Sequence, residues 1–189
     1  NNTFKARRSM MLVVKTYDMA GKENLLTQVF ADIGPTTGKR YFSIKNEIDK
    51  VAANEGIFLS LQLLDEEKKP ITENLYWIAD HSGNYSGLQK MKQSDLLVKA
   101  RWTQARMVEV TLENRENNPP AFFNRISLVD AGTQSRLLPV FYSDNYVTVL
   151  PGNKKTIIID CKNIGGKSNS AIAINGWNTG QRLIPIETN

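Results

Sequence analysis

Short stretches of alternating apolar and polar residues recur along the whole chain, with turn-forming residues between them. The clearest is 57–65, where every second residue from Ile57 to Leu63 is Ile or Leu, the period of two that marks a half-buried strand. Further strands are expected at 9–18, 25–32, 40–44, 73–79, 96–102, 106–114, 121–130, 137–142, 146–150, 154–160 and 171–177, the last of the chain. The only stretch with helical character, 48–54, is too short to change the class. The pattern predicts an all-β protein.

The length of the chain and one polar stretch predict two domains. A chain of 189 residues suits two sandwiches of roughly 90 residues each. Residues 80–95 are polar, hold two glycines and show no periodicity, which is typical of a connector. We therefore expect two tandem immunoglobulin-like β-sandwiches, at 1–82 and 92–189, joined by a linker at 83–91.

The distribution of charge argues against nucleic acid as a partner. The formal net charge is +5 and the pI is near 9.3. Residues 1–90 hold 12 Lys and Arg against 11 Asp and Glu, and residues 91–189 hold 12 against 8. The two signs are interspersed, so no basic stripe forms of the kind that follows a phosphate backbone. We expect no nucleic-acid partner, and no membrane span because no apolar run approaches about 18 residues.

Side chains suited to catalysis or metal binding are sparse. Cys161 is the only cysteine, which excludes an intrachain disulfide and favours a buried apolar role. His81 is the sole histidine and falls in the connector, and no G-x-S-x-G motif or phosphate loop occurs. Asp and Glu are numerous, but they fall in turns or at strand ends, where solvated carboxylates are ordinary. We expect no catalytic residue, no cofactor and no metal site.

The three tryptophans, Trp77, Trp102 and Trp177, are candidates for carbohydrate stacking, because sugars pack on flat exposed rings. Each falls within a strand pattern, so packing in a core or between domains is the favoured interpretation. A carbohydrate-binding module is the alternative, and exposed, coplanar Trp rings would distinguish it.

Three blocks in the second half of the chain are distinctive: AFFNRISLVD (121–130), LLPVFYSDNYVTVLPG (137–152) and GWNTGQRL (176–183). They resemble the C-terminal immunoglobulin-like domain of glycoside hydrolase family 2 enzymes of the exo-β-D-glucosaminidase and β-mannosidase group. In the first half, VVKTYDMAGKE (13–23), IFLSLQLLDEEKKPI (57–71) and ENLYWIA (73–79) resemble the preceding immunoglobulin-like domain of the same enzymes.

The resemblance implies accessory domains of a longer enzyme. Its catalytic barrel would be the partner, would lie upstream and would use two carboxylates to hydrolyse β-linked glucosamine or mannose-type residues. An oligosaccharide is a further possible partner. The first residue is Asn1 and not Met, so we expect an excised piece of a periplasmic or secreted parent, whose first domain begins inside its fold. An adhesion-type tandem immunoglobulin or fibronectin module is another alternative, and a stand-alone enzyme is the weakest.

The block Tyr142-Ser143-Asp144-Asn145-Tyr146 is the most distinctive of these sequences. Asp and Asn are depleted in strands and favoured in turns, so we expect a tight bend at Asp144-Asn145 between two aromatic anchors. One interpretation is a structural corner in which Asp144 accepts backbone N–H bonds. The other is a corner that faces the sugar site, with Tyr142 or Tyr146 as a stacking face.

Overall fold

The structure is a computed structural model that describes residues 1–52, 55–103, 106–162, 164 and 169–188. It divides into two compact units, unit 1 (Asn1–Met91) and unit 2 (Lys92–Asn189), and each is described by itself. Both are built from strands, so the predicted all-β class is confirmed. No helix in the described parts of the chain is long and apolar enough to cross a membrane.

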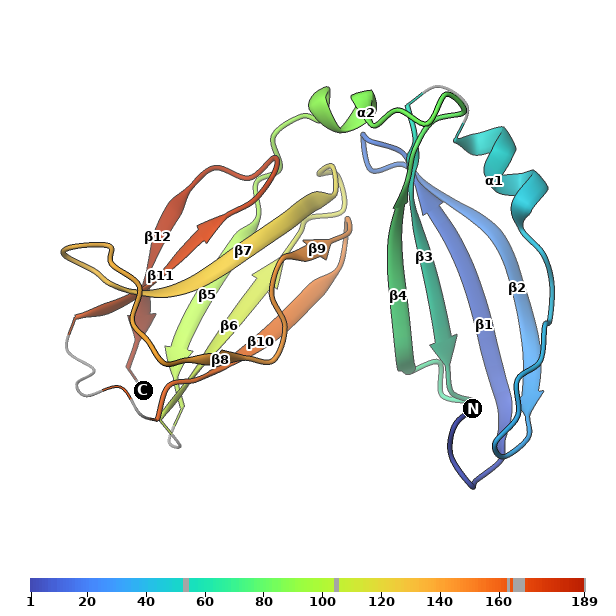
Figure 1. Cartoon of the computed structure of the whole chain (residues 1–189), viewed down its shortest axis with the longest axis horizontal. Helices are drawn as coiled ribbons and strands as arrows, with labels where there is room; N and C mark the ends of the chain where they lie inside the picture. The colour runs from blue at the N-terminus through green and yellow to red at the C-terminus, as the bar shows by residue number, and fades with distance from the viewer. Residues whose placement is uncertain (53–54, 104–105, 163, 165–168, 189) are drawn as a thin grey trace. The chain divides into compact units, whose positions relative to one another are not determined.

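Unit 1 holds one antiparallel sheet in its described residues, with the strand order β2-β1-β3-β4 (Figure 1). Its strands are β1 (Arg7–Tyr17), β2 (Glu23–Ile33), β3 (Ile57–Leu64) and β4 (Pro70–Ile78). Two tight turns join the hairpins. Asp18 Oδ1 accepts the amides of Ala20 and Lys22, and Asp65 Oδ1 accepts those of Glu67 and Lys69. These side chains satisfy amides that the ladder leaves unpaired, which fixes the register of both hairpins.

Two short helices complete unit 1, α1 (Lys45–Val51) and α2 (Ser86–Gln89). The first overlaps the stretch 48–54, whose described residues are 48–52. The expected strand at 40–44 was wrong, because this segment is irregular and Tyr41 instead donates its hydroxyl hydrogen to the carbonyl of Asp32. Residues 83–91, expected as a linker, belong to unit 1 and contain α2.

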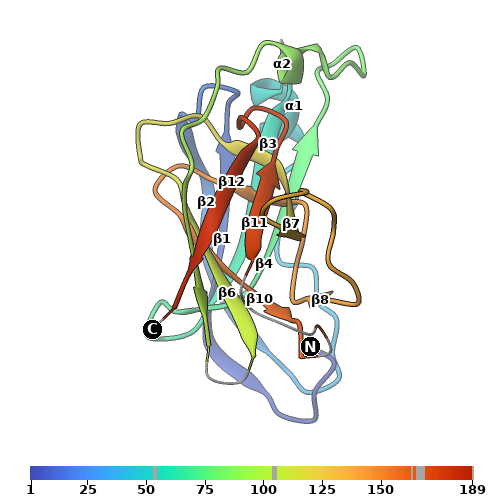
Figure 2. The same ribbon diagram turned by 90° about the vertical axis from the view of Figure 1, so that its left-hand side faces the viewer.

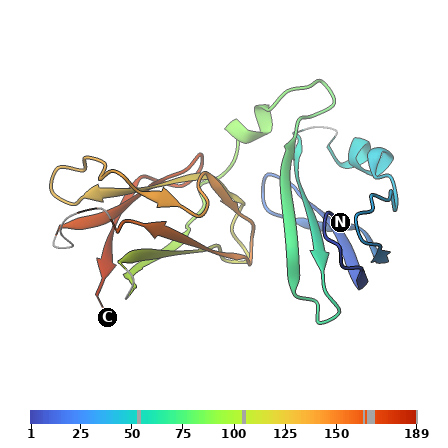
Figure 3. The same cartoon turned by 60° about the horizontal axis from the view of Figure 1, so that its bottom comes forward.

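Unit 2 has two layers of strands, which Figure 3 shows. The strands are β5 (Leu97–Trp102), β6 (Met107–Glu113), β7 (Ala121–Asp130), β8 (Phe141–Tyr142), β9 (Val147–Val149), β10 (Lys154–Asp160), β11 (Ser170–Asn175) and β12 (Arg182–Glu187). They are hydrogen-bonded in the order β8-β10-β6-β5-β12-β11-β7-β9. In Figure 2, β11 and β12 run side by side, and β12 joins β5 through a parallel pairing of Ile186 with Ala100.

Strand β12 is the element that the sequence pattern missed. The stretch 171–177 was expected to be the last strand of the chain. In the structure this strand ends at Asn175, and β12 follows it. The alternation in RLIPIE is present, but Pro185 lowers the strand signal because proline lacks an amide hydrogen. The expected strand at 137–142 is shortened to Phe141–Tyr142.

The core of unit 2 lies between its two layers. Buried aliphatic side chains alternate with more exposed side chains along β5, β6 and β10, as the period of two requires. The fully buried members include Leu96, Val108, Val110, Leu112, Ile159, Ile172 and Ile174. Cys161 also lies in this core, where its thiol contacts the carbonyl of Arg106.

Candidate functional site

Four aromatic rings from β7 and two loops of unit 2 form a continuous group that we call the aromatic ledge: Phe122, Phe123, Tyr146 and Trp177. The ring centroid of Phe123 lies 5.2 Å from that of Tyr146 and 5.5 Å from that of Phe122, which in turn lies 6.4 Å from Trp177. Phe122 is buried, whereas Phe123, Tyr146 and Trp177 are 40%, 50% and 56% exposed. The fold thus gathers three large exposed rings above one buried ring.

Two of the exposed rings stand on a strained backbone. Phe123 has a φ of 54° and Tyr146 a φ of 55°, in the left-handed region that bulky residues rarely adopt. The pairing of β7 with β9 shifts register between Ala121 and Asn124, so Phe123 sits on a β-bulge. Bulges redirect a side chain that a regular ladder would point elsewhere. The local backbone therefore departs from regular geometry where these two rings are presented.

The corner before Tyr146 is held by Asn145. Its Oδ1 accepts the amides of Ile126 and Tyr146, at 2.8 and 2.9 Å, and its Nδ2 donates to the carbonyl of Ile126 at 2.9 Å. The side-chain amide of Asn145 thus bonds to the backbone N–H and C=O of Ile126 on β7, as a neighbouring strand would. Asp144, which the sequence analysis favours for this role, is exposed and accepts only the adjacent amide of Asn145 at 2.8 Å among the described donors.

Tyr142 is half-buried and faces β7. Its hydroxyl accepts the amide of Leu128 at 2.9 Å. Burial raises the pKa of Tyr142, although that hydrogen bond and the charge of Arg136 act in the opposite direction. Tyr142 is therefore a neutral structural anchor, and Tyr146 is the tyrosine of this block that belongs to the ledge.

The side chain of Asn178 bonds to the backbone that carries the ledge. Its Oδ1 accepts the amide of Phe122 at 2.9 Å, and its Nδ2 donates to the carbonyls of Lys92 and Pro120, both at 2.9 Å. The next residue back, Trp177, donates its amide to the carbonyl of Phe122 at 2.9 Å. The loop that carries Trp177 is thereby tied to β7 by side-chain and backbone bonds.

Asn124 and Thr179 extend this support, and with Asn178 they form what we call the polar clamp. Thr179 Oγ1 lies 2.6 Å from Asn124 Oδ1, and Asn124 Nδ2 donates to the carbonyls of Ala121 and Val147. A Cβ at Gly176 would lie 2.3 Å from Thr179 Oγ1 and 2.4 Å from Asn124 Oδ1, so only glycine fits. All three clamp side chains are buried with their polar atoms bonded, which makes the ledge rigid.

The three tryptophans lie in different surroundings. Trp102 is 8% exposed and belongs to the core of unit 2, and Trp177 belongs to the ledge. Trp77 lies on β4 of unit 1, is 43% exposed and lines a hollow of about 670 Å³ together with Asp49, Asp80 and Tyr85. Burial removes Trp102 from the candidates for a sugar-stacking surface, whereas Trp77 and Trp177 are exposed.

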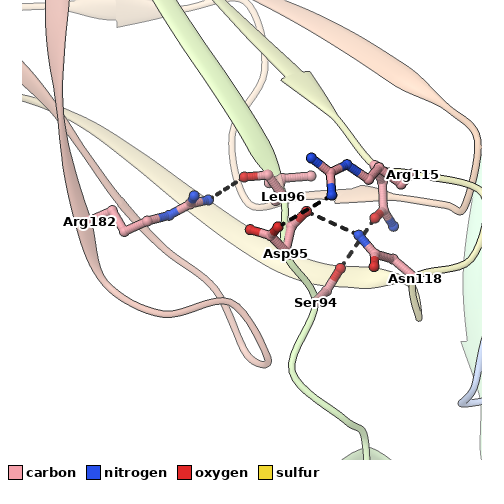
Figure 4. Close-up of polar contacts among 7 residues, drawn as sticks. Ser94, Asp95, Leu96, Arg115, Asn118 and Arg182 are labelled. Carbon is pink, nitrogen blue, oxygen red and sulfur yellow. Dashed lines mark hydrogen bonds and ion pairs between the residues drawn. The ribbon is translucent and has the colours of Figure 1, made fainter.

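A second polar group in unit 2 lies where β5 and β12 begin (Figure 4). Arg182 donates to the carbonyl of Leu96, and Asn118 Nδ2 donates to the carbonyl of Asp95 at 3.0 Å. Arg115 Nη1 lies 3.9 Å from the carboxylate of Asp95, and both side chains are more than 60% exposed. These bonds hold the first residues of β5 beside β12, so we assign the group to strand pairing.

The carboxylate of Asp130 is held in a turn of unit 2. Asp130 has a lowered pKa because the amide of Thr133, its hydroxyl, Asn169 and the amide of Gly132 all donate to it, although desolvation opposes them. It therefore caps a turn as an ionised group. Among the described residues, no group of three or more His, Cys, Asp or Glu side chains is placed to hold a metal ion.

Five residues of the ledge and the clamp were not singled out by sequence reasoning: Phe122, Phe123, Asn124, Asn178 and Thr179. All five fall inside the blocks 121–130 and 176–183, which were recognised as distinctive. Their spacing carries no local signal, because the ledge combines segments that are far apart in the sequence.

The comparisons with known proteins agree with the fold and with the resemblance. The Ig-fold domain of exo-beta-D-glucosaminidase matches residues 74–179, a range that includes the whole ledge and the polar clamp. The exo-beta-D-glucosaminidase of Arthroderma benhamiae is 28% identical over 170 residues, 80% of this chain and 18% of that protein. That of Amycolatopsis orientalis is 24% identical over 213 residues, 99% of this chain and 20% of that protein.

Solved structures show the same fold. The crystal structure of Amycolatopsis orientalis exo-chitosanase CsxA aligns with a TM-score of 0.74 and 22% identity, covering 98% of this chain and 24% of that one. The chain thus spans about a fifth of the length of the curated relatives it matches. Because the matched family covers more than half of the chain, the chain belongs to the family of exo-β-D-glucosaminidase immunoglobulin-fold domains.

Proposed function

We propose that this chain is a non-catalytic accessory part of a longer glycoside hydrolase of the exo-β-D-glucosaminidase type. Its aromatic ledge packs against the catalytic barrel of that enzyme. The family match and the small share of the relatives' length support an accessory role. The barrel supplies the two carboxylates that cleave a β-linked glucosamine or mannose-type residue, and the parent works in the periplasm or outside the cell.

The observation that carries the proposal is the strained and rigidly supported ledge. A bulky residue in the left-handed region costs about 1–3 kcal/mol, and this cost is present at both Phe123 and Tyr146. Such strain persists where the presented side chains have a use, because the surrounding structure must enforce it. Aromatic side chains on a rigid frame are also the commonest energetic centres of protein interfaces.

The geometry of the rings favours a protein surface over a flat sugar platform. The planes of Phe123 and Tyr146 are inclined by 43°, and those of Phe122 and Trp177 by 66°. Tilted rings leave notches between them that suit protruding side chains, whereas a carbohydrate-binding module of the kind considered above needs coplanar rings. The ledge therefore suits the role of a domain contact.

Ledge variants of the full-length parent enzyme test this function. We expect Phe123→Ala and Tyr146→Ala to lower its melting temperature and to separate the unfolding of the accessory part from that of the barrel, because about 2 kcal/mol or more of interface energy is lost at each anchor. The measurement is differential scanning calorimetry with kcat/KM on an aryl β-glucosaminide. Leu183→Ala, at a residue of matching 40% exposure on β12, is the control. Variants of the ledge that behave like Leu183→Ala would refute the docking role.

A further expectation concerns the chain alone. The 189-residue chain should not hydrolyse aryl β-glucosaminides or β-mannosides, because the acid and nucleophile belong to the barrel in this proposal. Turnover that disappears when one carboxylate of this chain is replaced would contradict the accessory assignment.

A further inference from the structure

We propose that the hollow of unit 1 beside Trp77, which we call the Trp77 hollow, is a binding site for a protonated amino sugar of a β-linked oligosaccharide. Its walls come from the end of β4, from α1 and from the segment that follows β4. The volume of about 670 Å³ is within the range of small-molecule sites. This inference goes beyond the accessory role and does not depend on it.

Two aromatic side chains form one half of the hollow. Trp77 on β4 is 43% exposed, and Tyr85, which precedes α2, is 49% exposed. Both line the same space, and Ile48 of α1 lines it as well. A pyranose ring has an apolar C–H face, and aromatic side chains with an apolar body and a polar end suit such an amphipathic ligand.

Two carboxylates form the other half. Asp80 accepts the amides of Ser82 and Asn84 with the same oxygen, Oδ1, at 2.9 and 2.8 Å. None of the described residues donates to its Oδ2, nor to the carboxylate of Asp49, which is exposed on α1. A carboxylate oxygen of this kind accepts a charge-assisted hydrogen bond from an ammonium group.

The charge of the wall selects a cationic ligand. Asp49 and Asp80 line the hollow with His81, and the described lining residues include neither lysine nor arginine. An anionic sugar would be repelled, and a neutral one would leave both carboxylates without a counter-charge. An amino sugar uses both halves, since its ammonium group pairs with a carboxylate and is also attracted to the face of a nearby aromatic ring.

The walls of the hollow approach one another closely. The imidazole Nε2 of His81 contacts the carbonyl oxygen of Asp49, which brings the segment after β4 next to α1. Gly56, just before β3, has a φ of +76°, and a Cβ there would lie 2.4 Å from the carbonyl oxygen of Ile78. The backbones therefore approach as closely as glycine permits beside the hollow.

A titration of the 189-residue chain tests the site. The probe is a β-1,4-linked glucosamine trisaccharide, and cellotriose, which has a hydroxyl in place of each ammonium group, is the matched neutral sugar. We expect saturable binding of the glucosamine trisaccharide by isothermal calorimetry, with a millimolar dissociation constant. Cellotriose should bind about fivefold more weakly or not at all, because it lacks the charged contacts.

Variants locate the site. Trp77→Ala should abolish saturation, and Asp49→Asn should weaken binding of the glucosamine trisaccharide about threefold while leaving cellotriose unchanged. Trp177→Ala, at a tryptophan of unit 2 that is 56% exposed, is the control and should leave the affinity unchanged. Trp77→Phe keeps a ring and should retain binding within about threefold, which covers the case that Trp77→Ala does not fold.

Three results would overturn the proposal: no saturable binding, equal affinity for the two trisaccharides, or loss of affinity in Trp177→Ala with Trp77→Ala unaffected. The titration measures the chain without a barrel, so its failure leaves the accessory role standing. Conversely, ledge variants that fail in the parent enzyme leave the sugar site of unit 1 standing.

Discussion

The two units have similar lengths and the same class of secondary structure, yet they bury their residues differently. In unit 2 the side chains of Val108, Val110 and Leu112 on β6 are completely buried between two layers. In unit 1 no residue of β4 is buried, and Phe30 on β2 is 77% exposed. An antiparallel sheet with one layer of described strands leaves apolar area at its edges and outer face. Thus β6 of unit 2 buries one face completely, whereas β4 of unit 1 buries no residue, and exposed aromatic side chains occur in both units.

Buried polar groups differ between the units in the same way. Unit 2 contains Asn114, Asn124 and Asn178, whose amides bond to backbone groups inside the fold. In unit 1 the turn-capping Asp18 and Asp65 make their bonds at the exposed surface. A satisfied buried amide fixes one arrangement of its neighbours, because any other leaves it unpaired at high cost. The buried amides of unit 2 therefore restrict how its strands and loops can pack.

The largest expected effect is a cavity in the core of unit 2. Leu112→Ala should lower the free energy of unfolding by about 2–5 kcal/mol, because a completely buried leucine is removed. Leu25→Ala on β2, where the side chain is 51% exposed, should cost about 0.5 kcal/mol or less. Urea unfolding followed by circular dichroism measures both. Similar costs for the two variants would remove the contrast between the units.

A smaller effect is expected at the polar clamp. Asn178→Ala should cost about 1–3 kcal/mol, because the Phe122 amide, the buried carbonyl of Pro120 and the partly buried carbonyl of Lys92 lose their partner. Asn118→Ala, which removes one exposed bond to Asp95, should cost about 0.5 kcal/mol. Thermal unfolding gives the costs, and hydrogen exchange should be faster at the Phe122 amide in Asn178→Ala. An unchanged exchange rate would argue against the clamp.

The smallest effect concerns a charged contact on the sheet of unit 1. Glu23 accepts a hydrogen bond from the hydroxyl of Tyr17 and forms an ion pair with Lys15 at 2.8 Å. Desolvation alone would raise the pKa of Glu23, but the hydrogen bonds from Lys15 and Tyr17 hold this pKa below its ordinary value. Burial and the neighbouring Glu23 raise the pKa of Tyr17. Because unfolded glutamate takes up protons first, this stabilisation is present above about pH 4.3 and is lost as the pH falls through the folded pKa.

Glu23→Gln should therefore destabilise the chain by about 0.5 kcal/mol at pH 7, a value reduced because the side chain is 44% exposed, and by less at pH 3. The measurement is urea unfolding at both pH values. Glu66→Gln in the exposed turn after β3 is the control, with no expected change at either pH. An equal loss at pH 3 and pH 7 would show that Glu23 does not stabilise the sheet through its charge.

Much of the fold was accessible from the period of two, and the errors have local causes. The strands around 57–65, 106–114 and 154–160 were predicted within one or two residues, because apolar residues recur with a period of two in their sequences. The segment 40–44 has β-forming residues but pairs with no described strand, and Tyr41 instead donates its hydroxyl hydrogen to the carbonyl of Asp32 on β2. Strand β12 pairs in parallel with β5, a long-range contact that no local pattern contains.

The sequence by itself determined the all-β class, the family of the second half and the identity of several exposed candidates, because strand period, turn chemistry and motif order are local properties. Only the tertiary structure decided that Trp102 is buried, that Tyr146 and Trp177 meet through Phe122 and Phe123, and that Asn145 rather than Asp144 holds the corner. These outcomes depend on which distant strands pair and where a bulge shifts the register, and the burial of a side chain follows from that pairing.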